Sequence, residues 1–206
     1  MKKFVKNSII STKFFIKDNT LTVIFITLFT VGTLIGSFSL YFSIDKSDSV
    51  ILLLNQYFSE NKSLSIMALF SRNLISAFIY LGIMYISGLC AIGLPFIGII
   101  PVIKGIAIGA IISYQYVYNG LKGFLYTLII ILIPAALLMA VFNLAYIEGM
   151  YMSLAVSNGI FNGKPRETKY SLSFMTFTKR FLIFSVGIVI ISILEAIVSS
   201  VFSSIL

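Results

Sequence analysis

Few side chains in this 206-residue sequence could do chemistry, and those that could stand in apolar surroundings. The three that matter are Lys104, Glu148 and Glu195, each an ionisable residue within or beside a long apolar run. A charge in lipid costs about 2.5 kcal/mol or more at a helix centre, so each needs a partner or a wet cavity. We expect Lys104 to pair with Glu195 or Glu148. Such a pair would either fix helix packing or line a polar pathway for ions or protons, and the sequence leaves both interpretations open.

The residue types exclude several kinds of active site. The chain contains no histidine, so histidine-based acid–base catalysis and histidine-ligated metals are ruled out. Cys90 is the only cysteine, so no internal disulfide or cysteine cluster is available. The sequence has no P-loop and no glycine-rich dinucleotide turn. We therefore predict that the protein is not an enzyme and uses no metal or other cofactor.

The composition is that of an integral membrane protein. Hydrophobic residues make up 59% of the chain and charged residues only 11%, with a mean hydropathy of +1.05, whereas soluble domains carry about 25% charged residues. About 20 apolar residues span a bilayer as a helix. We predict an all-α, polytopic membrane protein with residues 1–206 in a single membrane domain and about five transmembrane helices, at about 21–42, 74–92, 96–117, 123–147 and 181–203.

The basic residues predict the orientation of these spans. Ten of the fifteen lysines and arginines fall before the first span or in the basic loop 158–180. Because cytoplasmic segments are enriched in lysine and arginine, we place the N-terminus in the cytoplasm and the C-terminus outside, with residues 43–73 as an outer loop. We attribute the net charge of +8 to this topology and to anionic lipid rather than to nucleic acid.

Two pairs of glycines are spaced for close helix packing. Gly32 and Gly36 lie four residues apart on the first span, and Gly105 and Gly109 lie four apart on the third. Small residues at this spacing let helix backbones approach closely within lipid. We favour ordinary packing within the chain for each pair, and a homo-oligomer remains an alternative.

Further glycines and prolines indicate turns and interruptions. Gly93 and Pro95 predict a tight connection between the second and third spans. Gly98 and Pro101 can interrupt the third span, which requires protein or water around the freed backbone. Pro134 predicts a kink within the fourth span.

Several segments, in order and spacing, resemble the stage II sporulation protein M family. They are "GTLIG" in the first span, "LFSRNL" before the second, "YLGIMYISGLCAIGLPFIGIIPVIKGIAIGAII" across the second and third, and "EAIVS" in the last. Many wider relatives carry Pro-His-Gly followed by a glutamate in span four. Here Pro134 is followed by Ala135 and Ala136, so any activity that depends on that motif is in doubt.

The resemblance implies a function in engulfment, when the mother-cell membrane migrates around the forespore. Members of the family resemble a non-catalytic scaffold that localises two peptidoglycan-degrading partners, stage II sporulation proteins D and P. The implied location is the bacterial cell membrane, in its mother-cell or septal part. In the outer loop, an apolar group would be the docking surface or else part of a helix lying on lipid: Ile51, Leu54, Tyr57 and Phe58.

Two other functions remain open from the sequence. The first is a small transporter or permease subunit in which Lys104, Glu195 and an interrupted third span line a pathway. Interrupted helices near the midplane are typical of transporters, although those usually occur in paired repeats, and no convincing repeat is present. The second is a lipid-organising protein without a fixed partner.

Overall fold

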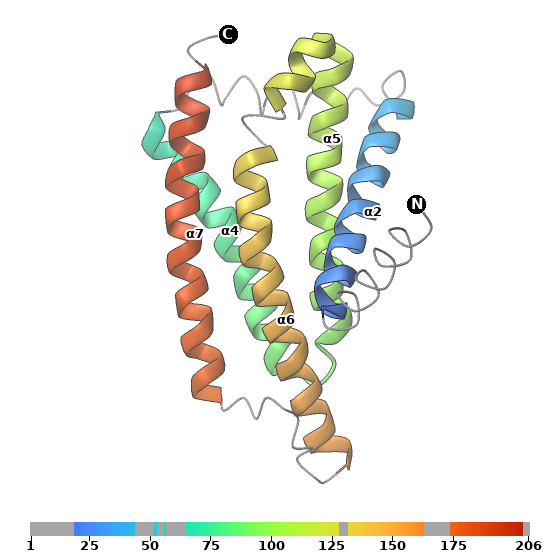
Figure 1. The fold of residues 1–206 in the computed structure, drawn as a ribbon, viewed down its shortest axis with the longest axis vertical. Helices are drawn as coiled ribbons and strands as arrows, with labels where there is room; N and C mark the ends of the chain where they lie inside the picture. The colour runs from blue at the N-terminus through green and yellow to red at the C-terminus, as the bar shows by residue number, and fades with distance from the viewer. Residues whose placement is uncertain are drawn as a thin grey trace, which may run out of the picture.

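The computed structural model describes residues 19–43, 52, 56, 65–127, 132–162 and 174–203, and this part of the chain is helical apart from the turn at residues 90–93 and single residues at helix starts. Five long helices are found there and shown in Figure 1: α2 (Thr20–Ser43), α4 (Ile66–Leu89), α5 (Leu94–Thr127), α6 (Ile133–Asn162) and α7 (Phe174–Ser203). All five are long and apolar enough to cross a membrane. For the described residues, this confirms the prediction of an all-α chain with about five spans.

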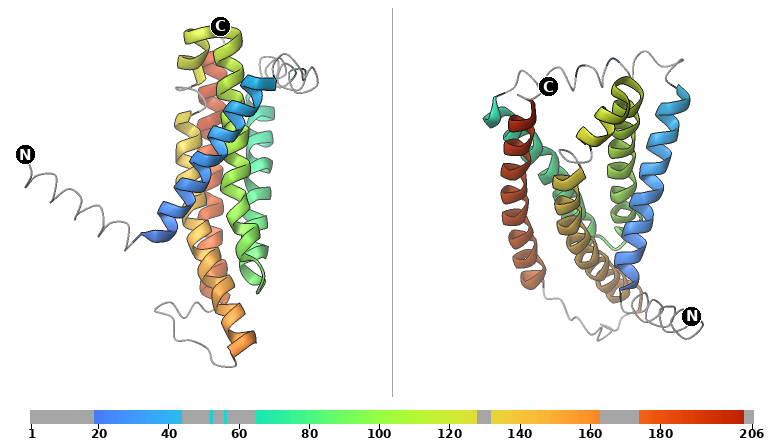
Figure 2. Two further views of the ribbon diagram at one scale, coloured as in Figure 1. Left: turned by 90° about the vertical axis from the view of Figure 1, so that its right-hand side faces the viewer. Right: turned by 45° about the horizontal axis from the view of Figure 1, so that its top comes forward.

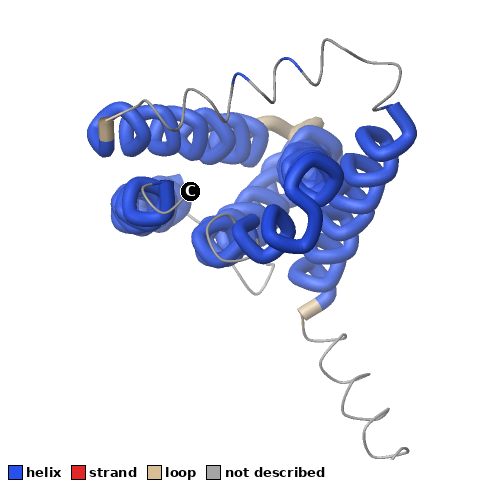
Figure 3. The backbone as a smooth tube through the Cα atoms, turned by 90° about the horizontal axis from the view of Figure 1, so that it is seen from above, coloured by secondary structure: helices blue, strands red, loops and turns tan. Residues whose placement is uncertain are grey.

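The helices stand side by side and alternate in direction, so that α2 begins at one end of the bundle and α7 finishes at the other (Figure 1). Helix α2 packs mainly against α5, whereas α4, α6 and α7 pack against one another. Contacts of α5 with α4 and α6 join the two groups. The views from the side and from above show α2 beside α5 at one flank and α7 at the other (Figures 2 and 3).

The helix ends differ from the expected spans where local signals extend or stop a helix. Helix α4 begins at Ile66 rather than near residue 74, because the Ser65 hydroxyl caps it by accepting a 3.4 Å hydrogen bond from the amide of Ala68. Helix α5 extends to Thr127, so the stretch 123–127 does not begin the fourth span. The backbone turns at Gly120, whose φ of 59° is a conformation that glycine adopts without strain.

The prolines interrupt the helices less than the sequence predicts. Pro101 is buried inside α5 without ending it, and the non-helical backbone in that helix lies at Gly120 instead. Pro134 is the second residue of α6, so the expectation of a kink within that helix is wrong. A proline in the first turn removes no intrahelical hydrogen bond, because the amides there have no partner within the helix.

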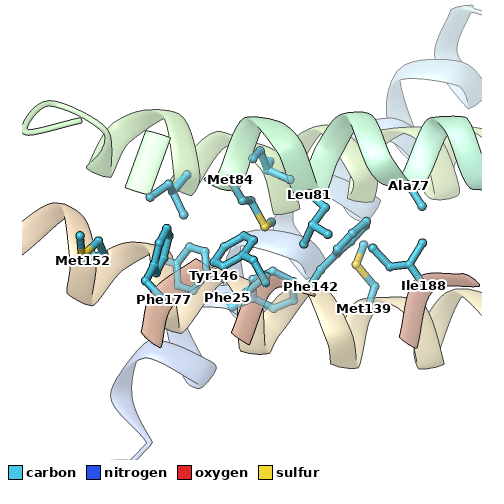
Figure 4. Packing of buried hydrophobic residues seen from close by; sticks show 14 of the residues in the cluster. Phe25, Ala77, Leu81, Met84, Met139, Phe142, Tyr146, Met152, Phe177 and Ile188 are labelled. Carbon is cyan, nitrogen blue, oxygen red and sulfur yellow. The ribbon is translucent and has the colours of Figure 1, made fainter. Parts of the chain in front are cut away.

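Aromatic, methionine and aliphatic side chains form the core between the helices (Figure 4). Phe142, Tyr146 and Phe177 are fully buried, and Tyr146 meets Phe25 of α2 edge to face with ring centres 5.3 Å apart. Tyr85 of α4 stacks on Phe177 of α7, also at 5.3 Å. These contacts join α2 to α6 and α4 to α7, while many large apolar side chains on the outer faces remain exposed, as expected for a bundle surrounded by lipid.

Candidate functional site

The two glycine pairs form one interface between α2 and α5. A Cβ atom added to Gly32, Gly36, Gly105 or Gly109 would come within 3.0 Å of the backbone of the opposite helix. Real Cβ atoms do not approach backbone so closely, so each of the four positions requires glycine at this separation. The hydroxyl of Ser37 adds a 3.0 Å hydrogen bond across the interface, donated to the carbonyl oxygen of Gly109. Packing within the chain thus occupies both glycine pairs.

The connection between α4 and α5 is a short turn held by the neighbouring helix. The amide of Gly93 donates to the carbonyl oxygen of Cys90 at 3.1 Å, and the hydroxyl of Ser153 on α6 donates to the same oxygen at 2.8 Å. A Cβ atom at Gly93 would overlap the carbonyl group of Ser87. Pro95 is the second residue of α5, where its missing amide hydrogen costs nothing.

Lys104 lies deep in the bundle and points at aromatic rings. It is ten residues after Leu94, or about 15 Å along α5 at 1.5 Å per residue. Its ammonium nitrogen is 4.0 Å from the ring centre of Tyr80 on α4 and 5.9 Å from that of Phe142 on α6. Such cation–π contacts stabilise a desolvated ammonium group. Lys104 also interacts electrostatically with Glu195, although the described part of the chain shows no direct ion pair between them.

Glu195 lies in the last third of α7. It stands five residues before the end of the α7 span at Ser200, and Arg72 stands six residues after the start of α4 at Ile66. Both residues are therefore about 8–9 Å from the same end, since α4 begins where α7 finishes (Figure 1). Glu195 interacts electrostatically with Lys104 and with Arg72. Cations on α4 and α5 thus attract one carboxylate on α7.

Glu148 has a different partner from the one expected. Its Oε1 atom accepts a hydrogen bond from Nη1 of Arg180, and this ion pair joins α6 to α7. The Glu148 side chain is 16% exposed and that of Arg180 is 39% exposed. The other carboxylate oxygen, Oε2, is buried without a hydrogen-bond partner among the described residues. Glu148 is therefore paired with Arg180 rather than with Lys104.

Three groups of contacts join the helices: the glycine interface between α2 and α5, the rings of Tyr80 and Phe142 around Lys104, and the Glu148–Arg180 pair. The sequence indicated Lys104, Glu148 and Glu195 by their cost in lipid, but it did not indicate Arg72 or Arg180 as partners. Both arginines stand near span ends, where they resemble ordinary topology signals. The proposed docking residues all lie outside the described part of the chain: Ile51, Leu54, Tyr57 and Phe58.

Comparison with known proteins identifies a family. A family model described as Stage II sporulation protein M matches residues 23–204 of the 206 residues. The matched stretch contains nearly all of α2 and the whole of α4, α5, α6 and α7. Neither a curated protein nor a solved structure matches the chain. The family suggested by the sequence segments is thereby confirmed.

Proposed function

The chain belongs to the stage II sporulation protein M family, and on that premise we propose that it is a non-catalytic membrane scaffold. Its role would be to localise peptidoglycan-degrading partners, stage II sporulation proteins D and P, in the mother-cell or septal membrane during engulfment. The observation that carries the proposal is the family match, which extends over residues 23–204 and therefore over almost the whole helical bundle.

The packing of the bundle supports a scaffold because a scaffold must hold its elements in fixed positions. Glycines bring α2 and α5 into backbone contact, and the Glu148–Arg180 ion pair joins α6 to α7. Lys104 is covered by the rings of Tyr80 and Phe142, so its charge acts as a contact between α5 and two other helices. These are the contacts of an anchoring residue, as expected if Lys104 fixes packing.

We place the docking surface in the segment between α2 and α4. In the predicted orientation this segment lies outside the cytoplasm, on the side where peptidoglycan is found. It carries Tyr57 and Phe58, and aromatic side chains are enriched among the residues that contribute most to protein interfaces. The N-terminus and the loop between α6 and α7 would lie in the cytoplasm.

The experiment is a purification of the tagged full chain in mild detergent from host cells entering starvation, with co-purifying proteins identified by mass spectrometry. We expect peptidoglycan hydrolases to be enriched. A double variant, Tyr57→Ser with Phe58→Ser, should lose them, whereas the control Tyr170→Ser, on the opposite side of the membrane, should keep them. Enrichment of an ATPase or a solute-binding protein without any hydrolase would contradict the scaffold and favour a transporter subunit.

A further inference from the structure

An open groove of about 420 Å³ lies between α2 and α5, next to their glycine interface. The close approach of the two helices ends where Ser37 bonds to Gly109. Beyond that point both helices carry larger side chains, including Phe38 and Tyr41 on α2 and Tyr116 on α5, and these line the groove. Gly36 lies about two turns before the end of α2, and Gly109 lies about three turns before the bend of α5 at Gly120, so the groove occupies the stretch beyond the glycine contacts.

The chemistry of the groove suits a hydrocarbon chain. Its walls are mainly apolar, with Phe38, Ile112 and Leu121 among the lining residues. Its volume falls within the range of about 300–1,000 Å³ that small-molecule sites occupy. It runs between two membrane-spanning helices, and Tyr41 and Tyr116 are exposed beside it. Exposed tyrosines near span ends are typical of the level where acyl chains meet headgroups.

A cation stands next to the end of this groove. Lys122 is exposed and directly follows Leu121, which lines the groove, just beyond the backbone turn at Gly120. It is one residue from the end of the α5 span at Gly123, and a lysine at a span end is expected near the membrane surface, where lipid phosphates lie. Lysines at this level attract anionic headgroups.

We propose that this groove binds an acyl chain of an anionic phospholipid, with the lipid phosphate held by Lys122. The apolar lining takes the hydrocarbon and the adjacent lysine supplies the complementary charge, so one molecule satisfies both features. The inference goes beyond the scaffold role and does not depend on it. A second copy of the chain or a partner helix would fill the same groove without bringing an anion to Lys122.

The absence of tryptophan from the chain permits a direct test. The full chain carrying Tyr116→Trp is reconstituted in vesicles of phosphatidylcholine mixed with phosphatidylglycerol whose acyl chains carry bromine, which quenches tryptophan fluorescence. The control carries Ile193→Trp on the lipid-facing side of α7. Both positions lie in the part of their helices near the same end of the bundle, and they are 51% and 44% exposed in the native chain.

We expect the tryptophan in the groove to prefer brominated phosphatidylglycerol over its phosphatidylcholine counterpart by about fivefold more than the control does, the ratio that one lysine near a membrane surface provides. Lys122→Gln should remove this preference, and Lys179→Gln, at an exposed lysine on α7, should not. Equal preferences at the two tryptophans would overturn the proposal, as would a preference that survives Lys122→Gln. A groove tryptophan shielded from both lipids would show a protein occupant instead, and cross-linking would then identify it.

Discussion

Gly109→Ala is the change that tests the packing of α2 against α5 most sharply. The added Cβ atom would lie 2.9 Å from the carbonyl carbon of Thr33 and 3.0 Å from the amide nitrogen of Ser37, and closer still to the Thr33 carbonyl oxygen. Ordinary contacts of a Cβ atom begin at 3.4 Å. The closest contact, to the Thr33 carbonyl oxygen, is relieved only if the helices separate by about one ångström, because backbone atoms cannot swing aside as a side chain can.

The expected loss of stability follows from two terms. Forcing a methyl group into a filled interface costs about 1–3 kcal/mol. The same separation lengthens the 3.0 Å hydrogen bond from Ser37 to Gly109, and bonds between membrane helices contribute about 0.6 kcal/mol on average. Alanine also stabilises a helix relative to glycine by up to about 1 kcal/mol, which offsets part of the loss. A control must remove that last term.

Gly98→Ala is that control, because Gly98 lies on the same helix and an added Cβ there meets nothing within 4 Å. We expect Gly109→Ala to be less stable than Gly98→Ala by about 2–3 kcal/mol. The measurement is unfolding of the purified full chain from mild detergent by increasing mole fractions of sodium dodecyl sulfate, followed by circular dichroism. Equal unfolding free energies for the two variants would refute the close contact between α2 and α5.

Three further outcomes can be checked in the same way. In a double-mutant cycle, Lys104→Met and Tyr80→Leu should show a coupling of about 1–2 kcal/mol in unfolding free energy, because each removes the same desolvated cation–π contact. Additive effects of the two substitutions would contradict that contact. In the predicted orientation, the turn that carries the exposed Cys90 faces the cytoplasm and Lys122 lies at the outer side. Cys90 should therefore resist a membrane-impermeant maleimide in intact cells, whereas Lys122→Cys in a Cys90→Ser background should react. The reverse pattern would show that the orientation is inverted. Gly93→Ala should prevent recovery of folded protein from membranes, since its Cβ overlaps the end of α4, and normal recovery would argue against the turn.

The spans could be predicted from the sequence because lipid imposes a length and a composition on any helix that crosses it. The same argument singled out Lys104, Glu148 and Glu195, since a charge in an apolar run has a cost wherever the helix lies. The glycine pairs on α2 and α5 were also visible. Their spacing indicates only that another helix can approach closely. Only the structure shows that the two pairs face each other.

The partners could not be predicted, because they depend on which helices are neighbours. Arg180 reaches Glu148 across the α6–α7 interface, and no local pattern distinguishes it from the other basic residues near span ends. Lys104 was expected to form an ion pair with a carboxylate, yet its ammonium group makes a cation–π contact with the ring of Tyr80. The start of the fourth span was misplaced for a local reason, since an apolar run begins at residue 123, whereas residues 123–127 belong to α5 and α6 begins only at Ile133.

The glycine interface and the groove are two parts of the same contact between α2 and α5, and this links their tests. Ser37 both lines the groove and bonds to Gly109, so separating the helices with Gly109→Ala must also reshape the groove. Lys122 is exposed beyond the turn at Gly120, so Lys122→Gln leaves the packing intact and removes only the charge. Lipid preference should therefore fall in both variants, but unfolding free energy should fall only with Gly109→Ala. A groove that bound lipid through its shape alone would lose its preference with Gly109→Ala and keep it with Lys122→Gln.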